Sequence, residues 1–177
     1  MKYVVMTEGT CEKALMDVLI DRSIFSISVE SLLYEQVFHA RQIKNSLIER
    51  INQLPASETI CIIRIGDKLN DELYIPDEIV DRVESCKKIC IKPEFEILHL
   101  IQKKEDTNYI RKYKSKMKVS EYLYQIDCNY EKTYEYNYEF FDSLSDEEIK
   151  NIARTYSCTR SKVHNKDEGT LEELIKL

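Results

Sequence analysis

The stretch that decides the fold is YVVMTEGTCEKAL, residues 3–15. Its apolar, β-branched start ends at Glu8 and Gly9, and from Thr10 onward apolar residues recur at helical spacing. This pattern predicts a strand, a tight turn at Gly9 and a helix with Thr10 as its N-cap. We therefore expect Glu8 at the carboxyl end of the strand, with Glu12 in the first helical turn beside it.

A second apolar run, ICIIRI at 60–65, is typical of a strand that is buried on both faces. Asp67 follows it closely. Because carboxyl ends of parallel strands meet at one edge of a sheet, we expect Glu8, Glu12 and Asp67 to converge. Converging carboxylates repel one another, and a hard divalent cation relieves that repulsion, which predicts bound Mg²⁺ or Mn²⁺. Acids after strands are also common helix caps and loop residues, and this alternative stays open.

Strand and helix patterns alternate along residues 1–105. Strands are predicted at 2–7, 24–29, 59–65 and 88–92, and helices at 10–22, 39–54, 77–86 and from Pro93. This order predicts an α/β fold with a mainly parallel four-stranded sheet and helices on both faces.

The segment 106–177 is expected to form a helical C-terminal extension packed on the α/β core, so that the chain makes one compact unit. Helices are predicted at 120–126 and 145–154, the second with Ser145 and Glu148 as a capping box. A length of 177 residues, 43% of them hydrophobic, suffices for one substantial core and a small appendage.

Several function classes are disfavoured by composition. No apolar run reaches the roughly 20 residues that span a bilayer, and no signal-peptide pattern precedes the first strand, which predicts a cytoplasmic protein without membrane contact. The six cysteines include no C-x-x-C pair, which argues against zinc and favours reduced thiols. Cys11 is the exception to follow, because a thiol in the first turn of a helix can have a lowered pKa.

Positive charge is concentrated in the segment 103–118, although the whole chain has a formal net charge of -6. Tyr109 and Tyr113 lie among its lysines, and basic residues with aromatic rings are suited to phosphate contact and base stacking. The segment therefore predicts nucleic-acid binding through four lysines: Lys112, Lys114, Lys116 and Lys118. A solvated helix face is the alternative reading of the same charge.

The stretches VVMTEGTCEKAL, IIRIGDKLND and IKPEFEIL occur in this order along the chain. Together they resemble the Toprim domain, particularly its OLD-type and RloB-type versions, in which a strand ends in an EGxxE turn. A later strand of that family ends in Asp-x-Asp, and a P-x-x-E or P-x-E-x-E stretch follows another. The chain matches the first motif with Glu8 and Glu12, and the third with Glu94 and Glu96. In the second motif Asp67 is present, but position 69 is Leu.

The resemblance implies a metal-dependent nuclease that hydrolyses phosphodiesters, in a branch associated with phage defence and mobile-element systems. The catalytic residues are then Glu8, Asp67 and Lys132, and the expected metal ligands are Glu8, Glu12 and Asp67 with Asp71 or Glu96. Lys132 and Arg160 are candidate cations for the phosphate.

Two other functions compete with this one. A catalytically inactive Toprim-like module that binds nucleic acid or a partner protein would explain the incomplete second motif. A flavodoxin-like or receiver-like domain also carries acids at strand ends, but it leaves Glu94 and Glu96 unexplained. Many Toprim-type nucleases act beside an ATPase. A separately encoded ATPase, another protein and a second copy of this chain are therefore the candidate partners.

Overall fold

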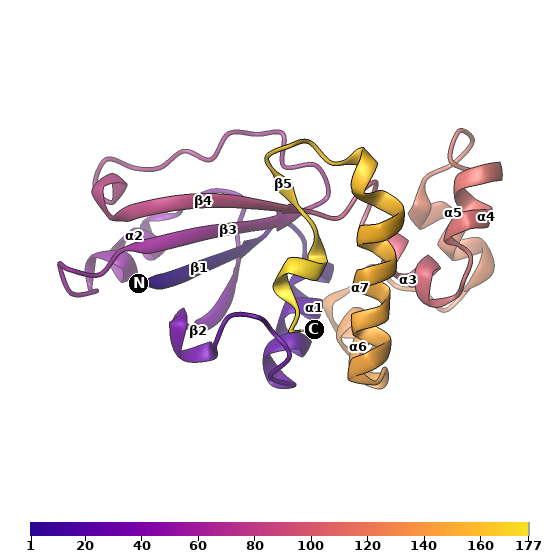
Figure 1. Ribbon diagram of the computed structural model, residues 1–177, viewed down its shortest axis with the longest axis horizontal. Coiled ribbons are helices and arrows are strands. Elements are labelled where there is room, and N and C mark those ends of the chain that lie inside the picture. The colour runs from indigo at the N-terminus through magenta and orange to yellow at the C-terminus, as the bar shows by residue number, and fades with distance from the viewer. Residues whose placement is uncertain (177) are drawn as a thin grey trace.

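The computed structural model describes residues 1–176, and within them the fold is α/β around an all-parallel sheet (Figure 1). The last residue of the segment predicted to end at 177 lies outside the described part. The strands are β1 (Lys2–Thr7), β2 (Leu32–His39), β3 (Ile60–Gly66), β4 (Val83–Cys90) and β5 (Glu168–Gly169). The helices are α1 (Thr10–Asp21), α2 (Asn45–Asn52), α3 (Ile97–Gln102), α4 (Asp106–Lys112), α5 (Val119–Ile126), α6 (Tyr134–Ser143) and α7 (Asp146–Arg160).

The sheet order is β2-β1-β3-β4-β5, so β1 lies between β2 and β3. The chain therefore passes to one side of β1 for β2 and to the other side for β3. Such a reversal opens a crevice beyond the carboxyl ends of the two central strands, where ligands bind in open α/β sheets. Thr7 of β1 pairs with Ile65 of β3, so Glu8 and Gly66 leave the sheet side by side.

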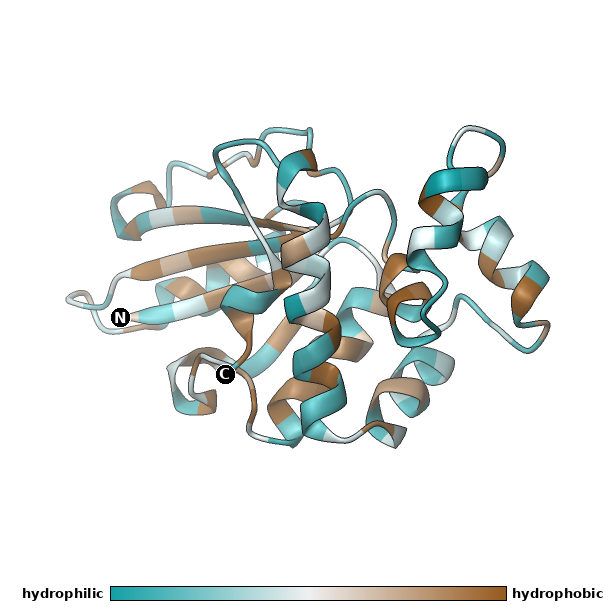
Figure 2. Cartoon of the chain, turned by 45° about the vertical axis from the view of Figure 1, so that its right-hand side comes forward, coloured by the Kyte–Doolittle hydropathy of each residue, from teal (hydrophilic) through white to brown (hydrophobic). Residues whose placement is uncertain are grey.

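Apolar layers cover both faces of the sheet, as the sequence predicted, and apolar residues concentrate on the strands and the helix faces that meet them (Figure 2). On one face, Val5 and Ile63 share a cluster with buried residues of α1, α3, α5, α6 and α7. On the other face, Val4 and Ile62 pack with Leu47 and other residues around α2. Alternate residues of one strand thus enter opposite layers.

The second strand was predicted at 24–29, and this prediction is wrong. Phe25 makes only an isolated antiparallel bridge to Ile175, while the second strand is β2, at Leu32–His39. Tyr34 and Glu35 inside β2 have positive φ angles of 54° and 56°, and the register with β1 shifts there. These two residues break the alternation of apolar and polar side chains by which a strand is recognised in a sequence.

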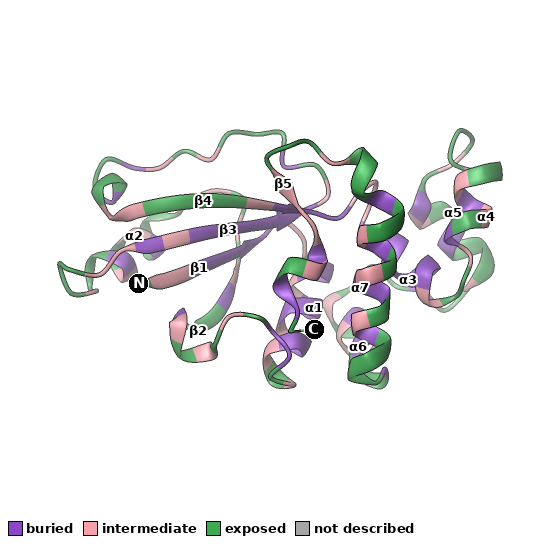
Figure 3. Ribbon diagram, in the orientation of Figure 1, coloured by how far each residue is buried: buried purple, intermediate pink, exposed green. Residues whose placement is uncertain are grey.

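The predicted helices at 39–54 and 77–86 are also different in the structure. The first is shorter, because β2 extends to His39 and α2 begins only at Asn45. In place of the second, a short 3-10 turn at Val80–Arg82 leads directly into β4. Most of β4 is exposed until its last two residues (Figure 3), so hydrogen bonding to β3 rather than an apolar pattern makes it a strand.

The C-terminal segment supplies both helices and a strand. The Ser145–Glu148 capping box is confirmed at the start of α7, which extends further than predicted, to Arg160. Beyond it, Glu168–Gly169 adds β5 beside β4, so the described sheet has five strands rather than four. Helices α4 and α5 lie at the end of the molecule far from β2 (Figure 1). Within residues 1–176 no helix is both long and apolar enough to cross a membrane.

Candidate functional site

A pocket of about 320 Å³ lies beyond the carboxyl ends of β1 and β3, at the reversal of strand order. Its lining consists of Glu8, Gly9, Thr10, Cys11, Glu12, Arg41, Asp67, Phe95 and Lys132. The three acids that the sequence predicted to converge therefore line one pocket, together with the predicted catalytic lysine. Glu8 and Asp67 lie far apart along the chain, and the pairing of β1 with β3 brings them together.

Glu8 is held at the end of β1 by its backbone N–H, which donates to the carbonyl oxygen of Ile65 at 2.8 Å. Its Oε1 is 3.0 Å from Nη2 of Arg41, and its Oε2 is buried without a hydrogen-bond partner. A Cβ atom at Gly66 would lie only 2.7 Å from that Oε2. The glycine at the end of β3 therefore makes room for the Glu8 carboxylate.

Glu12 is the most perturbed acid of the pocket. Its side chain is buried, and burial raises the pKa of Glu12 to about 7, with further contributions from the negative charges of Asp67 and Glu96. Its carboxylate folds back over the turn, where a Cβ at Gly9 would come within 2.3 Å of Oε2. Gly9 thus allows Glu12 to face the other carboxylates from the first turn of α1.

Glu96 lies behind the pocket and is completely buried. Its Oε1 accepts hydrogen bonds from the Tyr130 hydroxyl at 2.9 Å and from Nζ of Lys132 at 2.8 Å, whereas its Oε2 has no partner. Burial opposes the charge of Lys132, but the hydrogen bond and charge of Glu96 outweigh it and raise the pKa of Lys132. Lys132 is thereby kept protonated and fixed beside the carboxylates.

Asp71, predicted as a further metal ligand, does not line this pocket. Its carboxylate is 2.9 Å from Nη2 of Arg64 and accepts a hydrogen bond from Gln42 at 3.0 Å. Burial works against ionisation there, but the Arg64 guanidinium lowers the pKa of Asp71. Glu94 is also directed elsewhere, because it accepts two hydrogen bonds from Ser120 at the start of α5. Among the acids of the third motif, only Glu96 approaches the site.

The predicted nucleic-acid-binding lysines are all exposed, and three of them share a hollow. Lys114, Lys116 and Lys118 line a space of about 470 Å³, whereas Lys112 lies outside that lining. The tyrosines among them were expected to stack on bases, and for Tyr109 the structure excludes this. Its ring is 2% exposed, and its hydroxyl donates to the carbonyl oxygen of Met117 at 3.0 Å.

Cys11 was singled out because a helix N-terminus can lower the pKa of a thiol, and the structure gives the opposite result. The side chain is 3% exposed, and burial raises the pKa of Cys11 to about 12, with the charges of Glu12 and Glu96 adding to the effect. A thiol of this kind stays protonated at neutral pH and packs as a small apolar group.

A hard cation is the group that the donor chemistry of this pocket fits. All the acidic side chains offer carboxylate oxygens, and those on Glu8 and Glu96 each include one buried oxygen without a partner. Within residues 1–176, however, no group of three or more His, Cys, Asp or Glu side chains is already gathered as a metal would hold them. A cation would compete with Arg41 for Glu8 and with Lys132 for Glu96.

Arg41 is the member of the pocket that the sequence did not reveal. It follows the carboxyl end of β2, but the predicted helix at 39–54 placed it inside a helix instead. Correct placement of β2 would have flagged it, because all three strand ends then contribute a charged residue. No known protein family, curated protein or solved structure matches this chain, so the site has to be interpreted from its own geometry.

Proposed function

We propose that the protein is a metal-dependent nuclease of the Toprim type, a phosphodiester hydrolase acting in phage defence or on mobile elements. The observation that carries this proposal is the meeting of Glu8, Glu12 and Asp67 in one pocket at the strand-order reversal. The Toprim resemblance of the three sequence motifs adds the reaction type, since these are the acids that the motifs single out.

The proposed metal ligands are Glu8, Glu12 and Asp67, with Glu96 behind them. A bound Mg²⁺ or Mn²⁺ would supply activation of water and neutralisation of phosphate charge. In the metal-free pocket Glu12 can hold a proton near neutral pH, because its pKa is raised to about 7, and it would release this proton on binding the cation. Lys132 and Arg41 bring positive charge to the pocket, where they can stabilise charge on the phosphoryl group. In hydrolysis the oxygen of water forms a new P–O bond as the P–O bond to the leaving oxygen breaks, and the proton that the water loses ends on that leaving oxygen.

The test is cleavage of end-labelled single-stranded and duplex DNA and RNA with Mg²⁺ or Mn²⁺. Glu8→Gln and Asp67→Asn are expected to lose activity, on the order of 100-fold or more, because each removes a charged ligand of the cation. Asp77→Asn is the matched control, since Asp77 is an exposed acid that does not line the pocket. Equal activity of all three variants and the wild type would refute the assignment.

A second function is favoured by one specific observation, namely that Arg41 and Lys132 already neutralise two of the carboxylates. This arrangement suits a catalytically inactive Toprim-like module that binds nucleic acid or a protein. In that case no cleavage is seen with either metal, while nucleic acid is retained in a salt-dependent manner. A separately encoded ATPase or a second copy of the chain remains the proposed protein partner for either function.

A further inference from the structure

A second pocket, of about 330 Å³, lies where the loop after β3, the end of β4 and the end of α7 meet. Its lining residues are Lys68, Asn70, Lys92, Pro93, Lys114, Arg160 and Val163. Every charged residue of this lining is a cation. The charge of this pocket therefore differs from that of the carboxylate pocket, where three acids lie with Arg41 and Lys132, even though Lys68 directly follows Asp67 in the chain.

Arg160 is the decisive residue of this pocket. Its side chain is only 5% exposed, and its Nε is buried without an acceptor. Within residues 1–176, no carboxylate forms an ion pair with the Arg160 guanidinium. A buried cation without a partner is costly, because it has lost water and gained no compensating charge. Arg160 therefore lines the pocket with a guanidinium whose donor capacity is not fully used.

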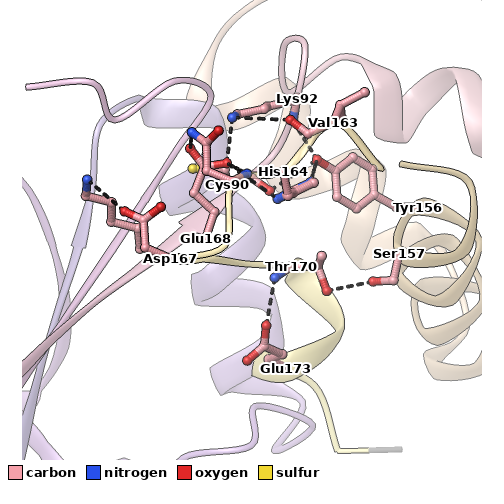
Figure 4. Close-up of polar contacts among 12 residues, drawn as sticks. Cys90, Lys92, Tyr156, Ser157, Val163, His164, Asp167, Glu168, Thr170 and Glu173 are labelled. Atoms are coloured by element: carbon pink, nitrogen blue, oxygen red, sulfur yellow. Dashed lines mark hydrogen bonds and ion pairs between the residues drawn. The ribbon is translucent and has the colours of Figure 1, made fainter. Parts of the chain in front are cut away.

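The wall that carries Lys92 is fixed by a hydrogen-bond network, shown in Figure 4. Lys92 itself is neutralised, because its Nζ lies 2.5 Å from Oε2 of Glu168. The Tyr156 hydroxyl accepts from the backbone N–H of Lys92, donates to the carbonyl oxygen of Cys90 and lies 2.9 Å from Nε2 of His164. This network holds the pocket wall in place without using Arg160.

Lys68 and Lys114 form no ion pair with any acid in the described part of the chain, and both side chains are exposed. Together with Arg160 they place three uncompensated cations on one pocket. The same two lysines and Pro93 also line the adjoining hollow that contains Lys116 and Lys118. Glu94 and Glu121 also line that hollow, so its four lysines leave it with a net positive charge next to the pocket of Arg160.

We propose that this second pocket binds a phosphate group. A guanidinium fork and two ammonium groups match the several oxygens of a phosphoryl dianion better than a single carboxylate. The adjoining basic hollow favours a phosphate carried by a nucleic-acid strand, either at its end or within its backbone. This inference rests on the proposed nuclease function and deepens it, because it would place a nucleic-acid strand beside the carboxylates. The binding itself requires no metal.

Binding is measured in EDTA by calorimetry or fluorescence anisotropy, so that failure of cleavage and failure of this pocket can be told apart. The probes are inorganic phosphate and one short oligonucleotide with either a 5′-phosphate or a 5′-hydroxyl. Preference for the 5′-phosphate identifies a strand end. Equal affinity for both oligonucleotides identifies an internal phosphate, and binding of inorganic phosphate alone identifies a free anion as the ligand.

Lys114→Ala is expected to weaken binding by about 10-fold, the usual effect of losing one charge-assisted contact. Arg160→Gln is expected to weaken it at least as much, with Arg160→Lys as a partial rescue. Lys162→Ala is the matched control, because Lys162 is an exposed lysine near the end of α7 outside the pocket lining. Lys114 is exposed, so its variant keeps the test decisive even if Arg160→Gln fails to fold. Absence of binding by the wild type, or equal weakening by Lys114→Ala and Lys162→Ala, would overturn the proposal.

Discussion

Replacing Glu12 by Gln should stabilise the metal-free protein above neutral pH. Because the pKa of Glu12 is raised from its ordinary 4.5 to about 7, the folded state favours the protonated carboxyl and resists its ionisation. The protonated Glu12 side chain therefore contributes its full stabilisation below pH 4.5, and this contribution is lost as the pH rises through about 7. At about 1.4 kcal/mol per pH unit, ionisation costs about 3 kcal/mol at pH 8. Gln has nearly the same shape and avoids that cost.

The assay is thermal or urea unfolding of wild type and Glu12→Gln in EDTA, at several pH values between about 4 and 8. At the acidic end the two proteins should be equally stable. At the alkaline end the variant should melt about 6 to 12 °C higher, given about 2 to 4 °C per kcal/mol for a chain of this size. Glu135→Gln is the control, because Glu135 lies exposed in the first turn of α6.

The quantity to follow is the difference in stability between Glu12→Gln and wild type at each pH, rather than the pH dependence of the wild type alone. Burial lowers the pKa of His99 to about 4, so the stability that His99 contributes is lost as the pH falls from 6.5 toward 4. That slope opposes the slope from Glu12, and the two cancel in part. A Glu12→Gln difference that does not change with pH, or that Glu135→Gln reproduces, would refute a buried carboxylate with a raised pKa.

Two further substitutions test how the fold holds the site. Gly66→Ala should destabilise the protein by about 1 to 3 kcal/mol, because the new Cβ meets Glu8 Oε2 at 2.7 Å and Leu69 at 3.0 Å. An unchanged melting temperature would show that Glu8 does not pack against this glycine. Ser145→Ala should cost about 1 kcal/mol in urea unfolding, because it removes the capping box of α7. Glu147→Gln, on the same turn but outside the box, should cost less than half as much.

The convergence of Glu8, Glu12 and Asp67 could be predicted because it depends on local patterns. A β-branched run followed by Glu8-Gly9 specifies strand and turn wherever the segment lies, and the apolar run before Asp67 specifies a buried strand. Once the two strands are taken as neighbours in a parallel sheet, as they are in the structure, their carboxyl ends come together. For the same reason the α7 cap was predicted correctly, since Ser145 and Glu148 contact each other within one turn.

The parts that could not be predicted depend on tertiary contacts. Asp71 has a spacing suited to the pocket, but buried Arg64 binds its carboxylate from within β3. The position of β2 was missed because Tyr34 and Glu35 have left-handed backbone conformations that interrupt its pattern. Spacing along the chain does not specify which cation will capture an acid. The cation that pairs with such an acid, as Arg64 pairs with Asp71, can be identified only once the strands have been placed relative to one another.

Charge is segregated along the carboxyl edge of the sheet, and this bears on how the two pockets would act together. Consecutive residues Asp67 and Lys68 line different pockets, one acidic and one basic. A polyanion is attracted to the basic side, whereas on the other side the three carboxylates outnumber Arg41 and Lys132 and repel its phosphates until a further cation binds. In the proposed function, binding of a nucleic-acid strand by Lys114 and Arg160 would therefore not depend on metal, whereas approach of a phosphate to Asp67 would. The same asymmetry explains how this edge of the sheet could hold a nucleic-acid strand without cleaving it.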